Sequence, residues 1–242
     1  MSKLSKLRDM NFDNNALVIG DAHEPYSHPD YKNFCYEVAN YFKCSSIFNI
    51  GDEVDNHAIS YHESDPDLPS AGDEFDKAYT AMQEWFALFS DVKVCIGNHT
   101  ALHMRKAYSS GLPKRMIKSY SEMWDAPAGW KWAEMWEFGN VVLEHGTGSA
   151  GQNGAINRAK DNRRSTVIGH IHSFGGVSYL ASDWDIIYGL NVGCGVDYKH
   201  PAFGYGKNFK KKPTLGCGVL LDGGRIGLFV PMDLGNKVKF SK

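Results

Sequence analysis

The chain has 242 residues, of which 43% are apolar and 22% charged, a composition typical of a globular protein rather than a disordered one. Its 26 basic and 28 acidic residues give a formal charge of −2, which excludes a generic polyanion binder and confines any nucleic-acid contact to local basic patches. No apolar run is long enough to span a bilayer, and the polar N-terminus lacks the apolar stretch of a signal peptide. We therefore expect no membrane partner.

The five cysteines are odd in number and scattered along the chain. None forms a CxxC pair, so the sequence suggests neither a disulfide framework nor a thiolate zinc site. This pattern is typical of a reduced protein, and we expect a cytoplasmic location.

The first half of the chain alternates strand-like and helix-like stretches. Apolar runs, each followed by a glycine, predict strands at 16–19, 46–50 and 92–96. Helical spacing of apolar residues predicts helices over 30–42 and 74–89, the second with Asp73 as its N-cap. This order predicts parallel βαβ units.

The second half is richer in strands and turns. Residues 141–144 and 166–168 predict short strands, and from residue 175 onward apolar runs are separated by glycine turns. The pair Asp222-Gly223 predicts a hairpin. We therefore expect two packed mixed sheets flanked by helices, in a single domain over 1–242.

Polar side chains suited to metal binding follow five predicted strands, and in open α/β sheets ligands bind beyond the carboxyl ends of the strands. Each fragment alone is a common loop feature, but their joint occurrence in order indicates one site. Oxygen and imidazole ligands without thiolates suit manganese, iron, zinc or cobalt. The residues are Asp21, His23, Asp52, Asp55, Asn98, His99, His145, His170 and His172.

The ordered set Asp21-x-His23, Gly51-Asp52-x-x-Asp55, Gly97-Asn98-His99, His145-Gly146 and Gly169-His170-x-His172 resembles the calcineurin-like metallophosphoesterase superfamily. The motifs run from residue 18 to 173. The resemblance implies a four-layer αββα sandwich of two mixed β-sheets and two divalent metal ions. Manganese is the first choice, with iron, zinc, cobalt and nickel as alternatives.

The resemblance also implies a role for each residue. One metal ion would be held by Asp21, His23, Asp52 and His172, and the other by Asp52, Asn98, His145 and His170, with Asp52 bridging the two. His99 would face the substrate phosphate without binding metal, and Asp55 would support its neighbours. The family commonly has an acid after Asn-His, where this chain has Thr100. Asp55 and Glu24 are the candidates to take its place beside His99.

The implied function is hydrolysis of a phosphate ester by a metal-bridging hydroxide. We favour a phosphodiesterase acting on nucleotides or nucleic acid, because two basic clusters could hold a polyanion: Arg158, Lys160, Arg163 and Arg164, and Lys207, Lys210, Lys211 and Lys212. The alternatives are a phosphomonoesterase acting on protein or small molecules and, below it, a non-catalytic scaffold. The sequence predicts neither the substrate's identity nor the oligomeric state.

The segment 100–140 is rich in tryptophans and basic residues. One interpretation is a substrate-facing insertion with stacking rings and phosphate-binding charges. The other, which base rates for buried aromatic residues favour, is an amphipathic helical pair whose tryptophans pack into the core.

Overall fold

The computed structural model describes residues 13–61, 67–206 and 210–232, which form two mixed β-sheets and the helices around them. The first sheet has six strands in the order β11-β10-β1-β2-β3-β4. β1 and β2 are parallel neighbours, as are β2 and β3, so the predicted βαβ units are confirmed. The strands are β1 (Asn15–Ile19), β2 (Cys44–Asn49), β3 (Asp91–Cys95), β4 (Gly129–Ala133), β10 (Gly216–Leu221) and β11 (Ile226–Pro231).

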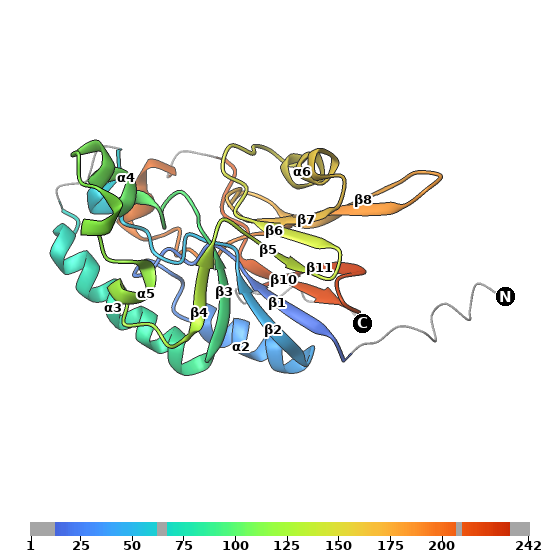
Figure 1. Cartoon of the computed structure of the whole chain (residues 1–242), viewed down its shortest axis with the longest axis horizontal. Helices are drawn as coiled ribbons and strands as arrows, with labels where there is room; N and C mark the ends of the chain where they lie inside the picture. Colours follow the sequence, from blue (N-terminus) through green and yellow to red (C-terminus); the bar gives the residue numbers. More distant parts are fainter. Residues whose placement is uncertain (1–12, 62–66, 207–209, 233–242) are drawn as a thin grey trace.

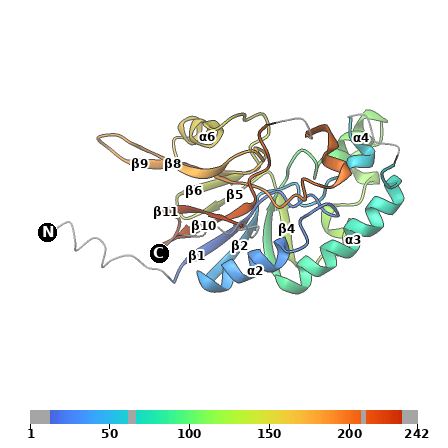
Figure 2. The same ribbon diagram turned by 180° about the vertical axis from the view of Figure 1, so that it is seen from behind.

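The second sheet has five strands in the order β5-β6-β7-β9-β8. β6, β7 and β9 are parallel, and the β8–β9 hairpin projects beyond the rest of the sandwich (Figure 2). The strands are β5 (Met135–Phe138), β6 (Val141–Glu144), β7 (Ser165–Ile168), β8 (Gly175–Ala181) and β9 (Ile186–Val192).

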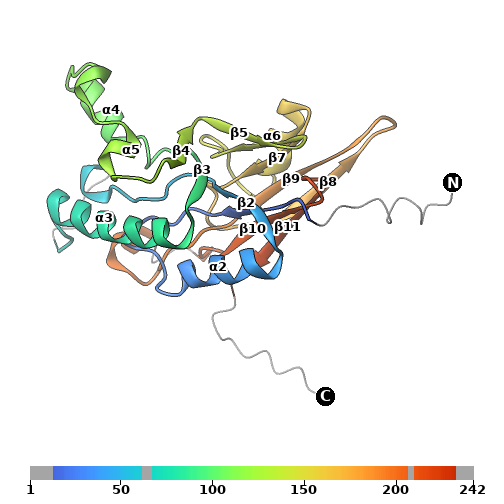
Figure 3. The same cartoon turned by 60° about the horizontal axis from the view of Figure 1, so that its bottom comes forward.

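Helices cover the outer faces of both sheets, and the inner faces pack against each other (Figure 1). The helices α2 (Tyr31–Tyr41) and α3 (Ala71–Leu88) cover the six-stranded sheet, and α6 (Gly154–Asn162) lies on the five-stranded sheet. Figure 3 shows α2 and α3 on the same side of the sheet. The predicted four-layer αββα sandwich is confirmed. Among the described residues, none of the helices is both long and apolar enough to cross a membrane.

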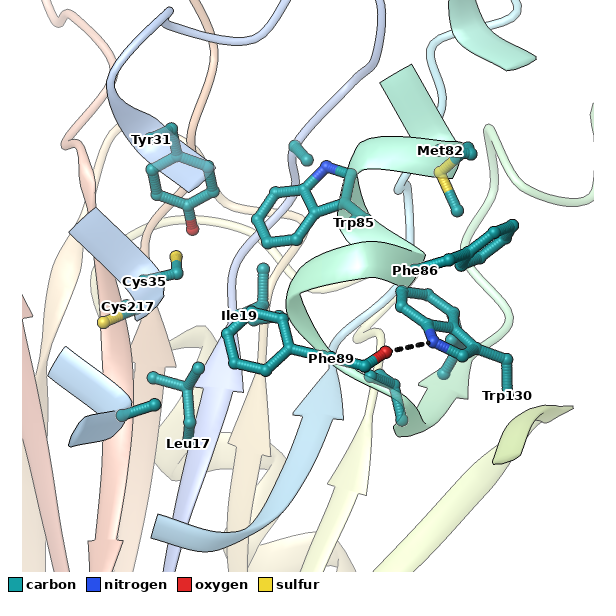
Figure 4. Close-up of a cluster of buried hydrophobic side chains, with 14 of the residues drawn as sticks. Leu17, Ile19, Tyr31, Cys35, Met82, Trp85, Phe86, Phe89, Trp130 and Cys217 are labelled. Atoms are coloured by element: carbon teal, nitrogen blue, oxygen red, sulfur yellow. Dashed lines mark hydrogen bonds between the residues drawn. The ribbon is translucent and has the colours of Figure 1, made fainter. Parts of the chain in front are cut away.

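The core between the first sheet and its helices is aromatic (Figure 4). The hydroxyl of buried Tyr31 accepts a hydrogen bond from the N–H of Gly20 and donates one to the carbonyl of Gly216. The indole of Trp130 donates to the carbonyl of Phe89, which ties β4 to the end of α3. These bonds satisfy the polar atoms of large buried rings, and they fix α2 and α3 beside the strand ends where the site is built.

The structure contains most of the helices and strands predicted from the sequence, but the start of one helix differs. Helix α3 starts three residues earlier than predicted, because Ser70 and not Asp73 is its N-cap. The Ser70 hydroxyl accepts a hydrogen bond from the N–H of Asp73 and donates one to the Asp73 carboxylate. Both side chains therefore stabilise the first turn of the helix. The hairpin predicted at Asp222-Gly223 is confirmed: β10 and β11 pair antiparallel, and Leu221 pairs with Ile226 across a loop in which Asp222 and Gly223 have positive φ, of 53° and 63°.

The segment 100–140 is only partly helical. It contains α4 (Leu102–Ser109), a 3₁₀ turn (Lys114–Met116) and α5 (Tyr120–Met123), and then enters the sheets as β4 and β5. The expected helical pair is therefore wrong for its second part, since alternating tryptophans in Trp130-Lys131-Trp132 follow the period of a strand. Trp124 and Trp130 are buried in the core, and the other two rings of the segment, Trp132 and Trp136, donate to buried acceptors.

Candidate metal centre

The site lies at the carboxyl edges of both sheets, where their parallel strands end. Asp21, Asp52 and Asn98 follow β1, β2 and β3 in the first sheet, while His145 and His170 follow β6 and β7 in the second. Backbone hydrogen bonds continue past the strand ends, as from the N–H of His23 to the carbonyl of Asp52 at 2.9 Å. All seven predicted ligands therefore meet at one place, although they come from five separate loops.

The first group of side chains, called here the His23 cluster, comprises Asp21, His23 and His172. His172 Nε2 lies 3.0 Å from Asp21 Oδ2 and 3.2 Å from His23 Nε2. The other ring nitrogen of His23, Nδ1, lies 2.5 Å from Asp55 Oδ1. A carboxylate on Nδ1 leaves Nε2 free to face the cluster, the arrangement by which outer partners orient metal-binding histidines.

The second group, called here the His145 cluster, comprises Asp52, Asn98, His145 and His170. His145 Nε2 lies 3.0 Å from Asp52 Oδ2 and 3.1 Å from Asn98 Oδ1. His145 Nδ1 contacts the carbonyl of Ile50 at 3.0 Å, so Nε2 again faces the cluster. The ring of His170 lies across from that of His145, with 5.2 Å between their centroids.

Two of the motif glycines make room for the carboxylates. A Cβ atom on Gly97 would overlap the carboxylate of Asp52, and one on Gly169 would overlap that of Asp21. Each carboxylate then accepts the backbone N–H of the histidine that follows in the same motif: His99 donates to Asp52 at 2.7 Å and His170 donates to Asp21 at 2.9 Å. The two motifs thus position acids that come from other strands.

Three of the site residues have left-handed backbone conformations that non-glycine residues rarely adopt. The φ angles are 54° at His23, 50° at Asp52 and 62° at His170. Such conformations cost on the order of 1–3 kcal/mol each, and they persist where surrounding contacts determine them. The hydrogen bonds around the two carboxylates supply those contacts.

His99 faces the cavity beside both clusters and is held by Asp55. His99 Nδ1 lies 2.5 Å from the carbonyl oxygen of Asp55 and 3.4 Å from its Oδ1. Glu24, the other candidate to replace the missing acid, instead accepts the indole N–H of Trp85 and pairs with Lys32. Asp55 therefore contacts both His23 and His99 and takes the place beside His99.

Thr100 takes part in a buried network that the sequence analysis missed. Its hydroxyl donates to Glu53 Oε2 at 2.6 Å and accepts the N–H of Asp52 at 3.0 Å. The other carboxylate oxygen of Glu53 accepts the indole N–H of Trp132 at 3.0 Å. The sequence shows only that Glu53 stands next to Asp52. Its partners Thr100 and Trp132 are 47 and 79 residues away and meet it only in the fold.

The charges of the two clusters differ. Burial opposes ionisation of the Asp52 carboxyl, but the nearby imidazole of His145 outweighs it and lowers the pKa of Asp52. Burial also opposes protonation of His145, yet Asp52 and Asp21 together raise its pKa to about 9. Burial prevails at His23, whose pKa is lowered despite the carboxylate of Asp55. Burial lowers the pKa of His99 too, but Asp52 and Asp55 outweigh it, and the net shift is upward.

The donor set fits divalent cations. Asp21 Oδ1 is buried and has no hydrogen-bond partner within the described part of the chain, although a buried carboxylate oxygen normally has one. In each cluster, carboxylate oxygens and imidazole Nε2 atoms lie within about 3 Å of one another, as ligands of a common ion do. A third group of possible ligands, His23, Asp55 and His99, shares His23 with the first.

A cavity of about 400 Å³ opens over the site. Its wall includes Asp52, Asn98, His99, His170 and His172 and, beyond them, Ser149, Tyr198, Phe203, Lys211 and Lys212. Of the two basic clusters noted in the sequence, only the second reaches this cavity, and its Lys207 lies outside the described residues.

The fold and the meeting of all five motifs agree with the resemblance read from the sequence. That resemblance is confirmed at the level of fold. No family model matches the sequence, and no curated protein is significantly similar to it.

Solved structures similar to this chain include the following three. Vacuolar protein sorting 29 from Cryptosporidium parvum has a TM-score of 0.43 at 13% identity over 87% of each chain. Vps29 from Chaetomium thermophilum has a TM-score of 0.40 at 10% identity over 86% of this chain and 81% of its own. The nuclease MPE of Pseudomonas putida has a TM-score of 0.33 at 12% identity over 92% of this chain and 93% of its own. Similarities this distant say nothing about activity, metal or partners.

Proposed function

We propose that this protein is a dinuclear metal-dependent phosphoesterase. The observation that supports the proposal is the meeting of seven oxygen and imidazole donors from five strand ends as two clusters on one cavity. A scaffold that had lost catalysis would be free to lose some of these donors, and every position is filled.

The proposed ion sites follow the two clusters. One ion would be held by Asp21, His23, Asp52 and His172, and the other by Asp52, Asn98, His145 and His170. When bound, two divalent ions supply hydroxide at neutral pH and stabilise charge on the phosphate oxygens. Two dications, the carboxylates of Asp21 and Asp52 and one hydroxide sum to a single positive charge, which attracts a phosphate ester. We take manganese as the first choice of metal.

His99 is the proposed catalytic residue of the chain itself. Because Nδ1 is held by Asp55, Nε2 is the ring nitrogen left to meet a ligand in the cavity. The carboxylates of Asp52 and Asp55 raise the pKa of the ring above its ordinary value. A protonated His99 can donate to a phosphate oxygen or give its proton to the leaving oxygen, while Asp55 keeps the ring in place.

We favour a phosphodiester of a nucleotide or nucleic acid as substrate. The support is the pair of lysines that lines the cavity together with the site residues. A phosphomonoester is the alternative. We also propose a cytoplasmic location, as expected from the unpaired pattern of the cysteines.

Hydrolysis of a matched aryl phosphodiester and aryl phosphomonoester by protein reconstituted with Mn²⁺ tests this function. We expect kcat/KM to be higher for the diester, and a chelator to abolish both reactions until metal is restored. A clear monoester preference would favour the phosphatase alternative. Full metal occupancy without hydrolysis of either ester would contradict the enzyme proposal and favour a scaffold.

A further inference from the structure

We propose that the segment 101–119, called here the α4 segment, is a docking surface for single-stranded nucleic acid. It contains α4 and the 3₁₀ turn Lys114–Met116, and it begins two residues after His99. The inference rests on the proposed phosphoesterase function and selects one substrate class among the esters open to the metal centre. No residue of the segment belongs to the five motifs or lines the cavity over the site.

The α4 segment is basic in a chain whose formal charge is −2. It contains no acidic residue, and its basic side chains are exposed except for one that is half-buried, Lys106. They are Arg105, Lys106, Lys114, Arg115 and Lys118. Across the described part of the chain, none of the five forms a salt bridge. Hydrogen bonds from Ser119 and then the charge of Lys118 lower the pKa of Glu122, so Lys118 has an acid nearby. The other four cations are the electrostatic signature of a surface that binds a polyanion.

Two exposed tyrosine rings lie among these charges. Tyr61 is 56% exposed, and its ring centroid lies 5.2 Å from the guanidinium carbon of Arg105 and 3.9 Å from Lys106 Nζ. Tyr108 is 52% exposed and stands one helical turn after Arg105, on the same side of α4. Surfaces that bind single strands combine cations that follow the phosphates with rings on which unpaired bases stack. The α4 segment and Tyr61 present both.

The fold places the α4 segment at the end of the molecule where the metal centre lies. The N–H of Ala101 donates to the carbonyl of Gly97 at 3.0 Å, and that of Leu102 donates to the carbonyl of His99 at 3.0 Å. Helix α4 is therefore a direct continuation of the motif that carries Asn98 and His99. Figures 1 and 3 show α4 at the end to which β1, β2 and β3 point. A strand with one phosphodiester at the metal centre can continue over the α4 segment.

An unpaired strand fits this surface better than other anions do. The bases of a duplex are stacked on one another and leave no face for the tyrosine rings, whereas an acidic peptide or an anionic lipid surface offers charge without bases to stack. The proposed metal centre acts on phosphodiesters, and a nucleic-acid strand carries one at every linkage. The same polymer therefore satisfies the metal centre, the cations and the rings.

The test is binding of a labelled oligothymidylate of about 12 nucleotides, a length typical of single-strand-binding sites. The full-length protein is kept in chelator so that the strand stays intact. We expect Lys114→Ala/Arg115→Ala to weaken binding by about tenfold or more at about 0.1 M salt, and to shrink the slope of log K against log salt by about 0.7 for each charge removed. The matched control, Lys131→Ala/Lys160→Ala, removes two exposed lysines elsewhere and should leave the slope unchanged.

Variants of Tyr108 test the stacking of bases. We expect Tyr108→Ala to weaken binding of the strand by about fivefold or more, and Tyr108→Phe, which retains the ring, to bind like the wild type. A duplex of the same length should bind more weakly than the strand. Wild-type binding by Tyr108→Ala, or a duplex bound as tightly as the strand, would overturn the assignment to an unpaired strand.

Hydrolysis separates this proposal from the proposed function. In Lys114→Ala/Arg115→Ala, kcat/KM for the aryl diester should be unchanged, because neither residue lines the cavity, while kcat/KM for the oligonucleotide falls. Unchanged strand binding in that variant, an equal loss in the control, or a greater loss for polyglutamate or phosphatidylserine vesicles would overturn the docking surface and leave the phosphoesterase in place. If the wild type hydrolyses no ester but strand binding falls as expected, the proposed function fails and the docking surface stands.

Discussion

The His23 cluster and the His145 cluster have the same kinds of ligand but different support. In the first, the ring of His23 is held by a carboxylate, that of Asp55 at 2.5 Å, and burial keeps the imidazole neutral. In the second, the ring of His145 is held by the carbonyl of Ile50, and the carboxylate of Asp52 favours its protonated form. Without metal, one cluster offers a neutral imidazole and the other an ion pair.

This difference shows that residue types alone do not determine how readily a site binds metal. A metal ion binds only the neutral ring, so an ion entering the His145 cluster must displace a proton, whereas one entering the His23 cluster meets a neutral His23. We expect the His23 cluster to fill first as pH or metal concentration rises.

Removing the charge of Asp52 should erase the difference, since both proposed ion sites depend on that carboxylate. We expect Asp52→Asn to lose metal from both clusters and to lower turnover by more than the roughly 10–100-fold that loss of an outer partner costs. Metal analysis and kinetics on one preparation check this, with the exposed Asp183→Asn as control. Full activity of Asp52→Asn in metal-free buffer would overturn the dinuclear proposal.

Removing His99 should leave both clusters filled. We expect His99→Ala to keep its metal content and to lose about 10²–10⁴ in turnover, because an acid or a donor to the phosphate oxygens is gone. Metal analysis and kinetics on one preparation of the variant check this expectation. If the variant loses a metal ion, His99 is a ligand and its assignment as a catalytic residue is wrong.

Thr100 holds Asp52, on which both proposed ion sites depend, so its loss should weaken both. Thr100→Val leaves the N–H of Asp52 and one oxygen of Glu53 without their partner, and each unsatisfied buried group costs about 1–3 kcal/mol. We expect a lower free energy of unfolding and weaker binding of both metal ions. Thr100→Ser retains the hydroxyl and should remain close to the wild type; an equal loss in both variants would show that packing, not hydrogen bonding, matters.

The pH dependence of metal binding gives the smallest of the four effects. Because the pKa of His145 is raised to about 9, the ring is protonated at neutral pH and metal must displace that proton. The overall affinity for the two ions should rise by about tenfold per pH unit up to about pH 9 and then level off. Metal titrations at several pH values, with proton release measured in two buffers, check that the affinity rises with pH. An affinity independent of pH between 7 and 9 would contradict it.

Short-range patterns predicted most of the fold. Apolar runs ended by glycine marked β1, β2 and β3, helical spacing marked α2 and α3, and Asp222-Gly223 marked the last hairpin. Where prediction failed, a competing local signal prevailed: Ser70 provides the N-cap of α3 three residues before Asp73, and Trp130 and Trp132 alternate as in a strand. These elements depend on neighbours within a few residues, which a single sequence displays.

The sequence alone indicated the candidate ligands, because parallel strands end at one edge and the side chains that follow them must meet there. Only the tertiary structure decided what supports those ligands. Asp55 rather than Glu24 holds His99, Glu53 joins Thr100 to Trp132, and Lys211 and Lys212 reach the cavity while Arg158 does not. Such partners are brought together by the packing of two sheets, and their spacing along the chain has no period that a sequence pattern reveals.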